Sequence, residues 1–317
     1  MNTKSQILVP VDFSNASLKA LDYATNIAKK INKKVIVVNT IQSRTSHSKG
    51  FKLPFGAKWN IKGNNIDSLF TYKLFRKNKK RLKALRLGWH NHNVIGHTTI
   101  KITDKEPLED IKQMVKYYEP SMLVLPFSSH SKFEQYFTSN LTLDVLRSIK
   151  VPTLFVPENS KINKIENIVL PSGFSEEVHA DFLQIIKRVS VAFEANLHMV
   201  KVLEDQEQTI DAEIKMRDFA ERKQLTNYKV NTIVADVVDE ALDVFQQSVK
   251  ADMICMMTKG KSCFSQLFYS NSTTETLLKN INKPILSMSS KGEKNDYSAK
   301  VSPMQKVTND IVRELSR

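Results

Sequence analysis

Short apolar runs alternate with segments of helical periodicity along most of this chain. Apolar residues fill 7–11 and predominate in 35–41, and between the two runs apolar residues recur every three or four positions. Continuous short runs are typical of strands buried on both faces of a parallel sheet, and the three-to-four spacing is typical of an amphipathic helix. Strand, helix and strand with short connections predict a right-handed crossover and a parallel α/β sheet.

The same alternation continues to about residue 290. We expect further strands at 94–102, 122–126 and from 153, then at 165–171, 197–203, 230–234 and 253–257. We expect helices at 108–119, from about 140, at 210–225 and at 240–249. Ser14 or Asn15 would cap the first helix of the chain, and Ser175 would cap the helix after 171.

One stretch of the chain occurs twice. Met122–Pro126 corresponds to Met253–Met257, and a set of later residues recurs at the same separation of 131 positions. The recurring pairs are Phe133 and Phe264, Phe137 and Phe268, Ser139 and Ser270, Asn140 and Asn271, Thr142 and Thr273, and Leu146 and Leu277. An internal repeat of this kind predicts two copies of one fold.

The repeat also predicts the domain boundaries. Pro10 and Pro171 are 161 positions apart, so the first copy is longer before the repeated stretch, and the poorly periodic segment 42–92 accounts for the difference. We expect domain 1 at 1–157 with a basic helical insertion at about 42–92, domain 2 at 158–290, and a polar C-terminal tail at 291–317.

Composition narrows the class of protein. With 41% hydrophobic and 25% charged residues among 317, the chain has the balance of a globular protein. The short polar start does not resemble a signal peptide, and no apolar run approaches the roughly 20 residues of a membrane helix, so we expect a cytoplasmic protein with no membrane partner. Cys255 falls in an apolar strand and Cys263 in a loop, which cannot form a disulfide framework.

Positive charge is concentrated in the first half of the chain. Residues 1–157 contain 26 Lys+Arg and 10 Asp+Glu, whereas 158–317 contain 21 and 23. A basic helix at about 67–87 carries much of the excess and could contact nucleic acid through 73–86. A lysine-rich solvated face is the simpler explanation and no nucleic-acid motif accompanies the helix, so nucleic-acid binding stays an alternative that we do not favour.

Other candidate chemistry is sparse. His90, His92 and His97 are close in sequence, but no carboxylate or cysteine joins them, so we expect no metal site. We find no Ser/His/Asp set or carboxylate pair that the predicted fold would bring together, and therefore expect no catalytic residues. Ligands of open parallel sheets bind beyond the carboxyl ends of the strands, where Asp12 and the loops after Pro126 and Met257 fall.

The opening Ile7-Leu8-Val9-Pro10-Val11-Asp12-Phe13-Ser14 and the two repeated stretches resemble the universal stress protein (UspA-like) family in its tandem two-domain form. The resemblance covers most of 1–157 and 165–290. It implies two open five-stranded parallel sheets with helices on both faces, an adenine nucleotide alpha hydrolase-like or Rossmann-like fold. It also implies pairing through the last strand of each sheet, which in a tandem chain gives an intramolecular pseudo-dimer, with a homodimer as a further option.

Nucleotide-binding members of that family carry Gly, two residues, Gly, nine residues, then Gly and Ser or Thr. The matching positions here are Pro126, Ser129, Ser139 and Asn140 in the first domain, and Met257, Gly260, Ser270 and Asn271 in the second. The aspartate of the family corresponds to Asp12, and Gly173 takes its place in the second domain. Neither domain keeps the full set, and side chains at these positions obstruct close approach of a phosphate to the backbone.

We therefore predict a stress-response protein that acts by binding or regulation, with degenerate nucleotide loops and no tightly bound cofactor. The candidate binding residues are Asp12, Ser129, Ser139, Asn140, Gly260, Ser270 and Asn271, and the ligand would be a small anion. The Ser-Asn pairs are also good helix caps, which is the simpler explanation of their recurrence. The alternative is an ATP or adenine-nucleotide sensor that works mainly through domain 2, with slow hydrolysis left open.

Overall fold

The computed structural model describes residues 6–42, 66–88, 94–103, 105–127, 139–160, 164–171, 179–258 and 283–289. Within these ranges the strands are β1 (Gln6–Val11), β2 (Lys34–Gln42), β3 (Ile95–Thr103), β4 (Met122–Phe127), β5 (Thr153–Pro157), β6 (Asn167–Pro171), β7 (Asn196–Leu203), β8 (Tyr228–Val234), β9 (Met253–Thr258) and β10 (Ile285–Ser289). The helices are α1 (Asn15–Lys30), α2 (Ile66–Gly88), α3 (Pro107–Tyr118), α4 (Ser139–Ser148), α5 (Ala180–Phe193), α6 (Thr209–Arg222) and α7 (Val238–Ser248).

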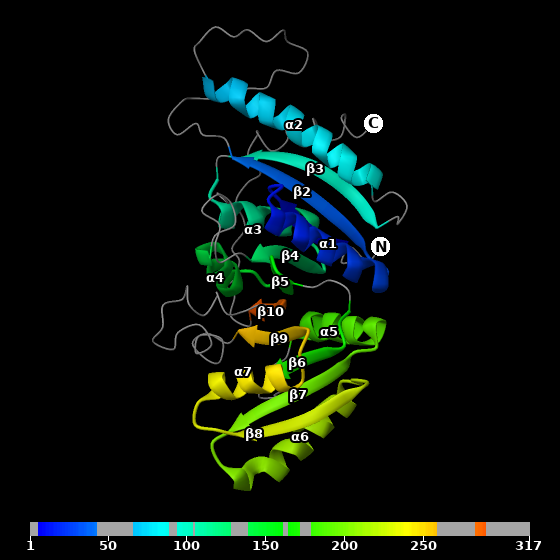
Figure 1. The fold of residues 1–317 in the computed structure, drawn as a ribbon, viewed down its shortest axis with the longest axis vertical. Helices are drawn as coiled ribbons and strands as arrows, with labels where there is room; N and C mark the ends of the chain where they lie inside the picture. Colours follow the sequence, from blue (N-terminus) through cyan, green and yellow to red (C-terminus); the bar gives the residue numbers. More distant parts are fainter. Residues whose placement is uncertain are drawn as a thin grey trace.

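All of these strands lie in one continuous 10-stranded sheet, in the order β3-β2-β1-β4-β5-β10-β9-β6-β7-β8. Within each half, β1 to β5 and β6 to β10, every neighbouring pair is parallel. The halves meet where β10 runs antiparallel to β5, with Leu286 opposite Leu154 and Ser287 opposite Thr153. The molecule is elongated along the sheet, from β3 at one end to β8 at the other (Figure 1).

This arrangement confirms the predicted α/β class and the pairing of the halves through the last strand of each. The strand registers also confirm the alignment of the repeat. Ile7 lies opposite Met122 in the first half, and Ile168 lies opposite Met253 in the second. Ile168 follows Ile7 by 161 positions, and Met253 follows Met122 by 131 positions. The second pair therefore repeats the first pair, although the two offsets in the sequence differ.

Helices cover both faces of the sheet. On one face α1 and α2 of the first half and α5 and α6 of the second half pack into a single apolar core that includes Leu154 and Leu286 at the junction. On the other face α3 and α4 form a second core, which Met256 and Ile285 of the second half join. Because both cores cross the junction, the two halves share buried surface in addition to the strand pairing.

The basic helix predicted at 67–87 is present as α2. It connects β2 to β3 just as α6 connects β7 to β8, so α2 is the counterpart of a regular helix of the fold rather than an addition to it. The connection before it is the longer part: β2 and α2 are separated by 43–65, whereas β7 and α6 are separated by 204–208. The helix α2 is itself longer than α6, with 23 residues against 14, so both the connection and the helix add to the length of the first half.

Helix capping agrees with the sequence in the first half and differs in the second. Ser14 is the N-cap of α1, and its hydroxyl accepts from the Ser17 backbone N–H at 3.1 Å. The helix that Ser175 was expected to cap begins later, at Ala180, and its N-cap is His179, whose Nδ1 accepts from the Asp181 backbone N–H. Of the helices described, none combines the length and the apolar character needed to cross a bilayer.

Candidate ligand site at the carboxyl edge of the sheet

The turn between β1 and α1 lies at the edge where ligands of this class of sheet bind. Asp12 immediately follows β1, and its Oδ1 accepts a hydrogen bond from the Ser14 backbone N–H at 2.9 Å. Phe13, between them, has a φ of 65°. This left-handed conformation is unfavourable for a residue with a side chain, by roughly 1–2 kcal/mol, so surrounding contacts must hold the turn in place.

Arg81 of α2 supplies one of those contacts. Its guanidinium lies over the Phe13 ring, 5.2 Å from the ring centroid. A cation over an aromatic face contributes about 0.5–1 kcal/mol at an exposed site. The basic helix therefore reaches the β1–α1 turn and covers part of it.

A pair of buried asparagines fastens α2 to the sheet beside this turn. Asn39 of β2 is completely buried, and its Nδ2 donates to the Val11 carbonyl oxygen at 2.7 Å. Asn78 of α2 is also buried, and its Nδ2 donates to Asn39 Oδ1 at 2.9 Å. The side-chain amide oxygen of Asn78, Oδ1, has no hydrogen-bond partner among the described residues. Buried amides of this kind need partners, so the pair specifies where α2 sits.

The second half lacks this arrangement. Val38 lies opposite Pro10 and Val200 lies opposite Pro171, so the position equivalent to Asn39 is Lys201. Lys201 is half-buried and follows Val200 in β7. The two halves therefore share strand register but differ in the residues beside the ligand edge.

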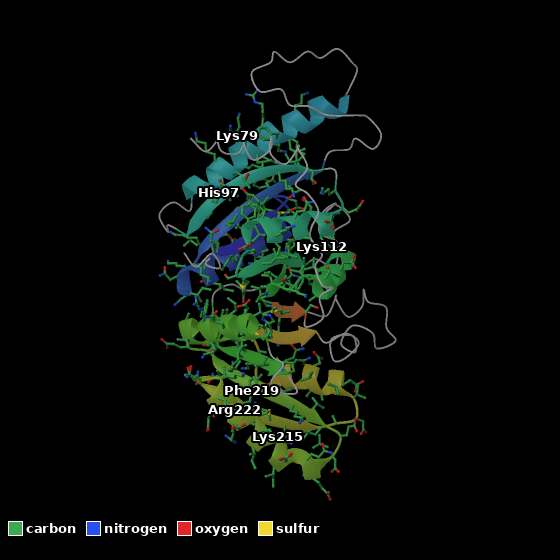
Figure 2. All side chains as sticks on the ribbon, turned by 180° about the vertical axis from the view of Figure 1, so that it is seen from behind. Lys79, His97, Lys112, Lys215, Phe219 and Arg222 are labelled. Carbon is green, nitrogen blue, oxygen red and sulfur yellow. The ribbon has the colours of Figure 1, made fainter. Side chains whose placement is uncertain are left out.

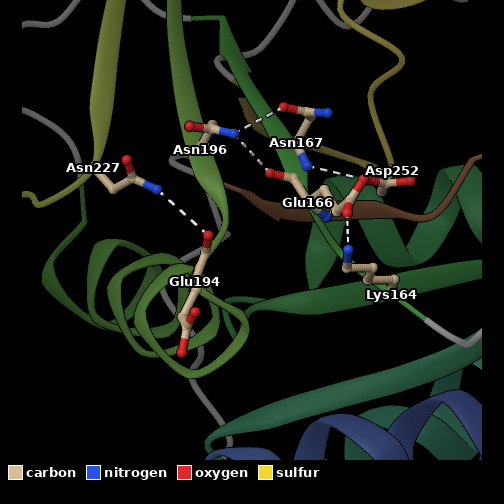
Figure 3. Close-up of polar contacts among 7 residues, drawn as sticks. All are labelled: Lys164, Glu166, Asn167, Glu194, Asn196, Asn227 and Asp252. Atoms are coloured by element: carbon tan, nitrogen blue, oxygen red, sulfur yellow. Dashed lines mark hydrogen bonds and ion pairs between the residues drawn. The ribbon is translucent and has the colours of Figure 1, made fainter.

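The opposite edge of the second half is held together by its own polar side chains (Figure 3). Asp252 Oδ2 accepts from the backbone N–H groups of Glu166 and Asn167 at 2.8 and 3.0 Å. Asn196 Nδ2 donates to Asn167 Oδ1 at 3.3 Å, and Asn227 Nδ2 donates to the Ala195 carbonyl oxygen at 2.9 Å. These residues start or precede adjacent parallel strands, and their groups are paired with one another, so we assign them to strand alignment rather than to ligand binding.

Two groups whose pKa is shifted by burial, Lys33 and Cys255, lie away from the ligand edge. Burial, with a smaller effect of the nearby Arg188, lowers the pKa of Lys33 to about 8, and its Nζ donates to Ser121 Oγ at 2.9 Å at the amino edge of the sheet. Burial raises the pKa of the Cys255 thiol, which is in the core of the sheet as predicted. Lys33 therefore lies at the amino edge and Cys255 lies inside the sheet, away from the β1–α1 turn.

A profile of the universal stress protein family matches residues 5–53 and 168–287. The matched residues make up more than half of the chain, and each matched segment falls in a different half of the sheet. The chain belongs to the universal stress protein family. No curated protein sequence matches it.

Solved structures agree with the family on the fold. A universal stress protein from Archaeoglobus fulgidus DSM 4304 is 19% identical with a TM-score of 0.65, and the match covers 91% of this chain and 99% of that chain. A protein of unknown function from Pseudomonas aeruginosa PAO1 is 11% identical with a TM-score of 0.55, and the match covers 98% and 97%. The cytoplasmic domain of a prokaryotic cation chloride cotransporter is 11% identical with a TM-score of 0.51, and the match covers 90% and 96%. At these identities the likeness is one of fold alone.

The structure brings only part of the predicted universal stress protein site into view. Asp12 is at the end of β1 as expected. Ser139 and Asn140 form the first turn of α4, and the orientation of their side chains stays a prediction. Ser129, Gly260, Ser270 and Asn271 lie outside the described residues.

The sequence did not predict the contacts of the residues in and beside the β1–α1 turn. Phe13 was quoted only as part of an opening motif, and Asn39 only as part of an apolar strand. A signal existed for Asn39, because an amide within the run Val35–Ile41 requires a buried partner. Asn78 is likewise an uncharged amide within a run of lysines and arginines.

Proposed function

We propose that this universal stress protein acts in the cytoplasm by binding and regulation, without tight nucleotide binding and without catalysis. The observation that carries the proposal is the state of the β1–α1 turn. Asp12 accepts from Ser14 N–H, and Phe13 lies beneath the Arg81 guanidinium. One carboxylate oxygen of Asp12 and the ring of Phe13 are therefore engaged with the chain itself.

The residues at the former glycine positions support the same proposal. Pro126 is buried in β4, where it pairs with Val156. Proline has no backbone N–H to offer a phosphate and its ring fixes φ. Met257, at the equivalent place in β9, adds a long side chain where the family has glycine. Proline at this position gives a triphosphate one backbone donor fewer in the first half, and methionine stands at the family's glycine position in the second.

The antiparallel contact of β5 with β10 supports the proposal of an internal pseudo-dimer. The last strand of each half is already paired within one chain, so this contact is not available for a second copy. A homodimer, if one forms, would use another surface. The same proposal includes the ends of the two domains, at residue 157 for the first and at residue 290 for the second.

The alternative function is an adenine-nucleotide sensor, and Asp12 and Gly260 favour it. Asp12 keeps the family residue in the first half, and Gly260 keeps one glycine of the phosphate loop in the second. A small anionic ligand at the start of α4 is compatible with either function, because a helix N-terminus favours negative charge.

A thermal-shift experiment separates the two functions. A ligand with a Kd of 10 µM, present at 1 mM, stabilises a protein by about 2.7 kcal/mol, which corresponds to several degrees in Tm. We expect Mg-ATP at 1 mM to shift Tm by less than about 1 °C, and we expect mass spectrometry of the purified protein to release no stoichiometric nucleotide. A shift of several degrees would support the sensor, and its loss in Gly260→Val but not in Asp12→Ala would assign it to the second half.

A further inference from the structure

The outer side of α2 carries a dense basic surface at one end of the molecule. The exposed residues of this surface, called here the α2 basic face, are Lys73, Arg76, Lys77, Lys79, Lys80, Arg81 and Lys83. Lys79 lies beyond β3 at the end of the sheet, far from the labelled residues of α6 at the other end (Figure 2).

The neighbouring sequence supplies no acidic residue that could offset these charges. Residues 68–103, which include all of β3 and most of α2, contain neither Asp nor Glu. The inner side of α2 is apolar apart from Asn78: Leu82 and Leu85 pack in the same core as Ile95 and Ile100 of β3. The two strands packed against α2, β2 and β3, therefore contain no acidic residue, and Asp12 lies in the β1–α1 turn that Arg81 reaches.

The equivalent helix of the second half is built differently. On α6, Lys215 pairs with Asp211, Arg217 with Glu213, and Arg222 with Asp218, each one helical turn apart. Such i,i+4 pairs are typical of a solvated helix that is stabilised by its own charges. The helices α2 and α6 occupy equivalent positions in the two halves. Because α6 fills this position with paired charges, the fold does not require the excess positive charge of α2.

The chemistry of the α2 basic face fits a phosphate-rich polymer. The α2 basic face extends over residues 73–83, which is about 16 Å of helix, or roughly half a turn of duplex DNA. None of the exposed large apolar side chains belongs to described positions 73–85, so this part of the helix has no apolar side chain to insert into lipid. Phe75 is half-buried, which argues against base stacking on this face and favours contact with a duplex backbone.

We propose that the α2 basic face binds the phosphate backbone of duplex nucleic acid without sequence preference. The sequence alone favoured a solvated helix. The buried inner side, the absence of acidic residues over 68–103 and the charge-paired α6 at the equivalent place favour a polyanion partner instead. Arg81 is the member of the α2 basic face that contacts the β1–α1 turn. The test below leaves Arg81 unchanged, so this activity can be measured separately from the nucleotide question.

The test uses the full-length protein and a labelled duplex DNA of random sequence. Binding is followed by fluorescence anisotropy between 50 and 200 mM salt, where each phosphate contact contributes about −0.9 to the slope of log Kobs against log salt concentration. The variant Lys77→Gln/Lys79→Gln/Lys80→Gln/Lys83→Gln removes four exposed charges and keeps Arg81, which contacts Phe13. We expect it to weaken binding at least about tenfold and to reduce the slope by about 3 to 4.

A variant of α6 provides the matched control. Lys215→Gln/Arg217→Gln/Arg222→Gln/Lys223→Gln changes the net charge equally, and we expect it to bind within about twofold of the unmodified protein. An equal loss in both variants, or no salt-dependent binding by the unmodified protein, would overturn the proposal. Vesicles that contain anionic phosphatidylserine are a second ligand for the same proteins. Tighter binding to these vesicles than to DNA would overturn the proposal in favour of a role at a membrane surface. Circular dichroism spectra and Tm values are the check that each variant is folded.

Discussion

The Asn39–Asn78 contact makes a sharp prediction, because removing one partner should cost more than removing both. In Asn39→Leu, the hydrogen bonds to Val11 and from Asn78 are lost, at a net of about 0.5–1.5 kcal/mol each. The Asn78 amide is then buried without its acceptor, at about 1–3 kcal/mol more. The single substitution should therefore destabilise the first half by about 2–6 kcal/mol.

The double substitution Asn39→Leu/Asn78→Leu should recover much of this loss. It removes both buried side-chain amides, including the Asn78 Oδ1, which has no partner among the described residues. Replacing both partners by apolar groups of similar size can be nearly neutral. We expect a cost of about 0–2 kcal/mol and a coupling energy of at least about 1.5 kcal/mol between the two sites.

Urea unfolding followed by tryptophan fluorescence is the assay. The chain has two tryptophans, Trp59 and Trp89, and both fall in the first half of the sequence, so their signal reports on that half. Hydrogen exchange of 66–88 should rise in Asn39→Leu, because α2 loses its polar attachment. Lys201→Leu, at the equivalent position of the second half, is the control and should leave both signals unchanged. Additive costs for the two asparagines, or a cost below about 0.5 kcal/mol for Asn39→Leu, would refute the reasoning.

Three further predictions concern capping, pH and thiol reactivity. Ser14→Ala removes the side-chain cap of α1 and should cost about 1 kcal/mol in urea unfolding, whereas Ser14→Asp should retain most of the stability. Burial, and then Lys229, lower the pKa of His198 in the folded state, so the unfolded chain binds the proton more readily. Stability should therefore be full above about pH 6.5 and fall as pH drops below it, and His198→Phe, which keeps a ring beside Phe245, should show a smaller fall. In a Cys263→Ser background, the buried Cys255 should react with a thiol reagent only as fast as the protein unfolds, and rapid labelling under native conditions would contradict its burial.

Much of the fold could be predicted because buried parallel strands leave clear patterns. The strand expected at 122–126 is β4 at Met122–Phe127, and the helix expected at 108–119 is α3 at Pro107–Tyr118. The repeat predicted the shared register of both halves, since a sequence offset that preserves apolar positions also preserves which residues lie opposite one another.

The candidate site was less predictable because it depends on contacts between distant residues. The bond between Asn39 and Asn78 requires the position of α2 on β2, which follows a long connection without periodicity. The left-handed φ of Phe13 has no signal in its residue type, because glycine and asparagine are the residues that usually adopt this conformation. Similarly, Ser175 is the better cap by residue preference, but α5 begins after His179.

Isothermal titration calorimetry with Mg-ATP tests the central claim most directly. The proposal that this universal stress protein regulates by binding, with a ligand edge engaged by its own residues, predicts no saturable heat with a Kd below about 100 µM, which corresponds to a binding free energy of about −5.5 kcal/mol. A stoichiometric titration with a Kd in the low micromolar range would contradict it and would make the chain a nucleotide sensor.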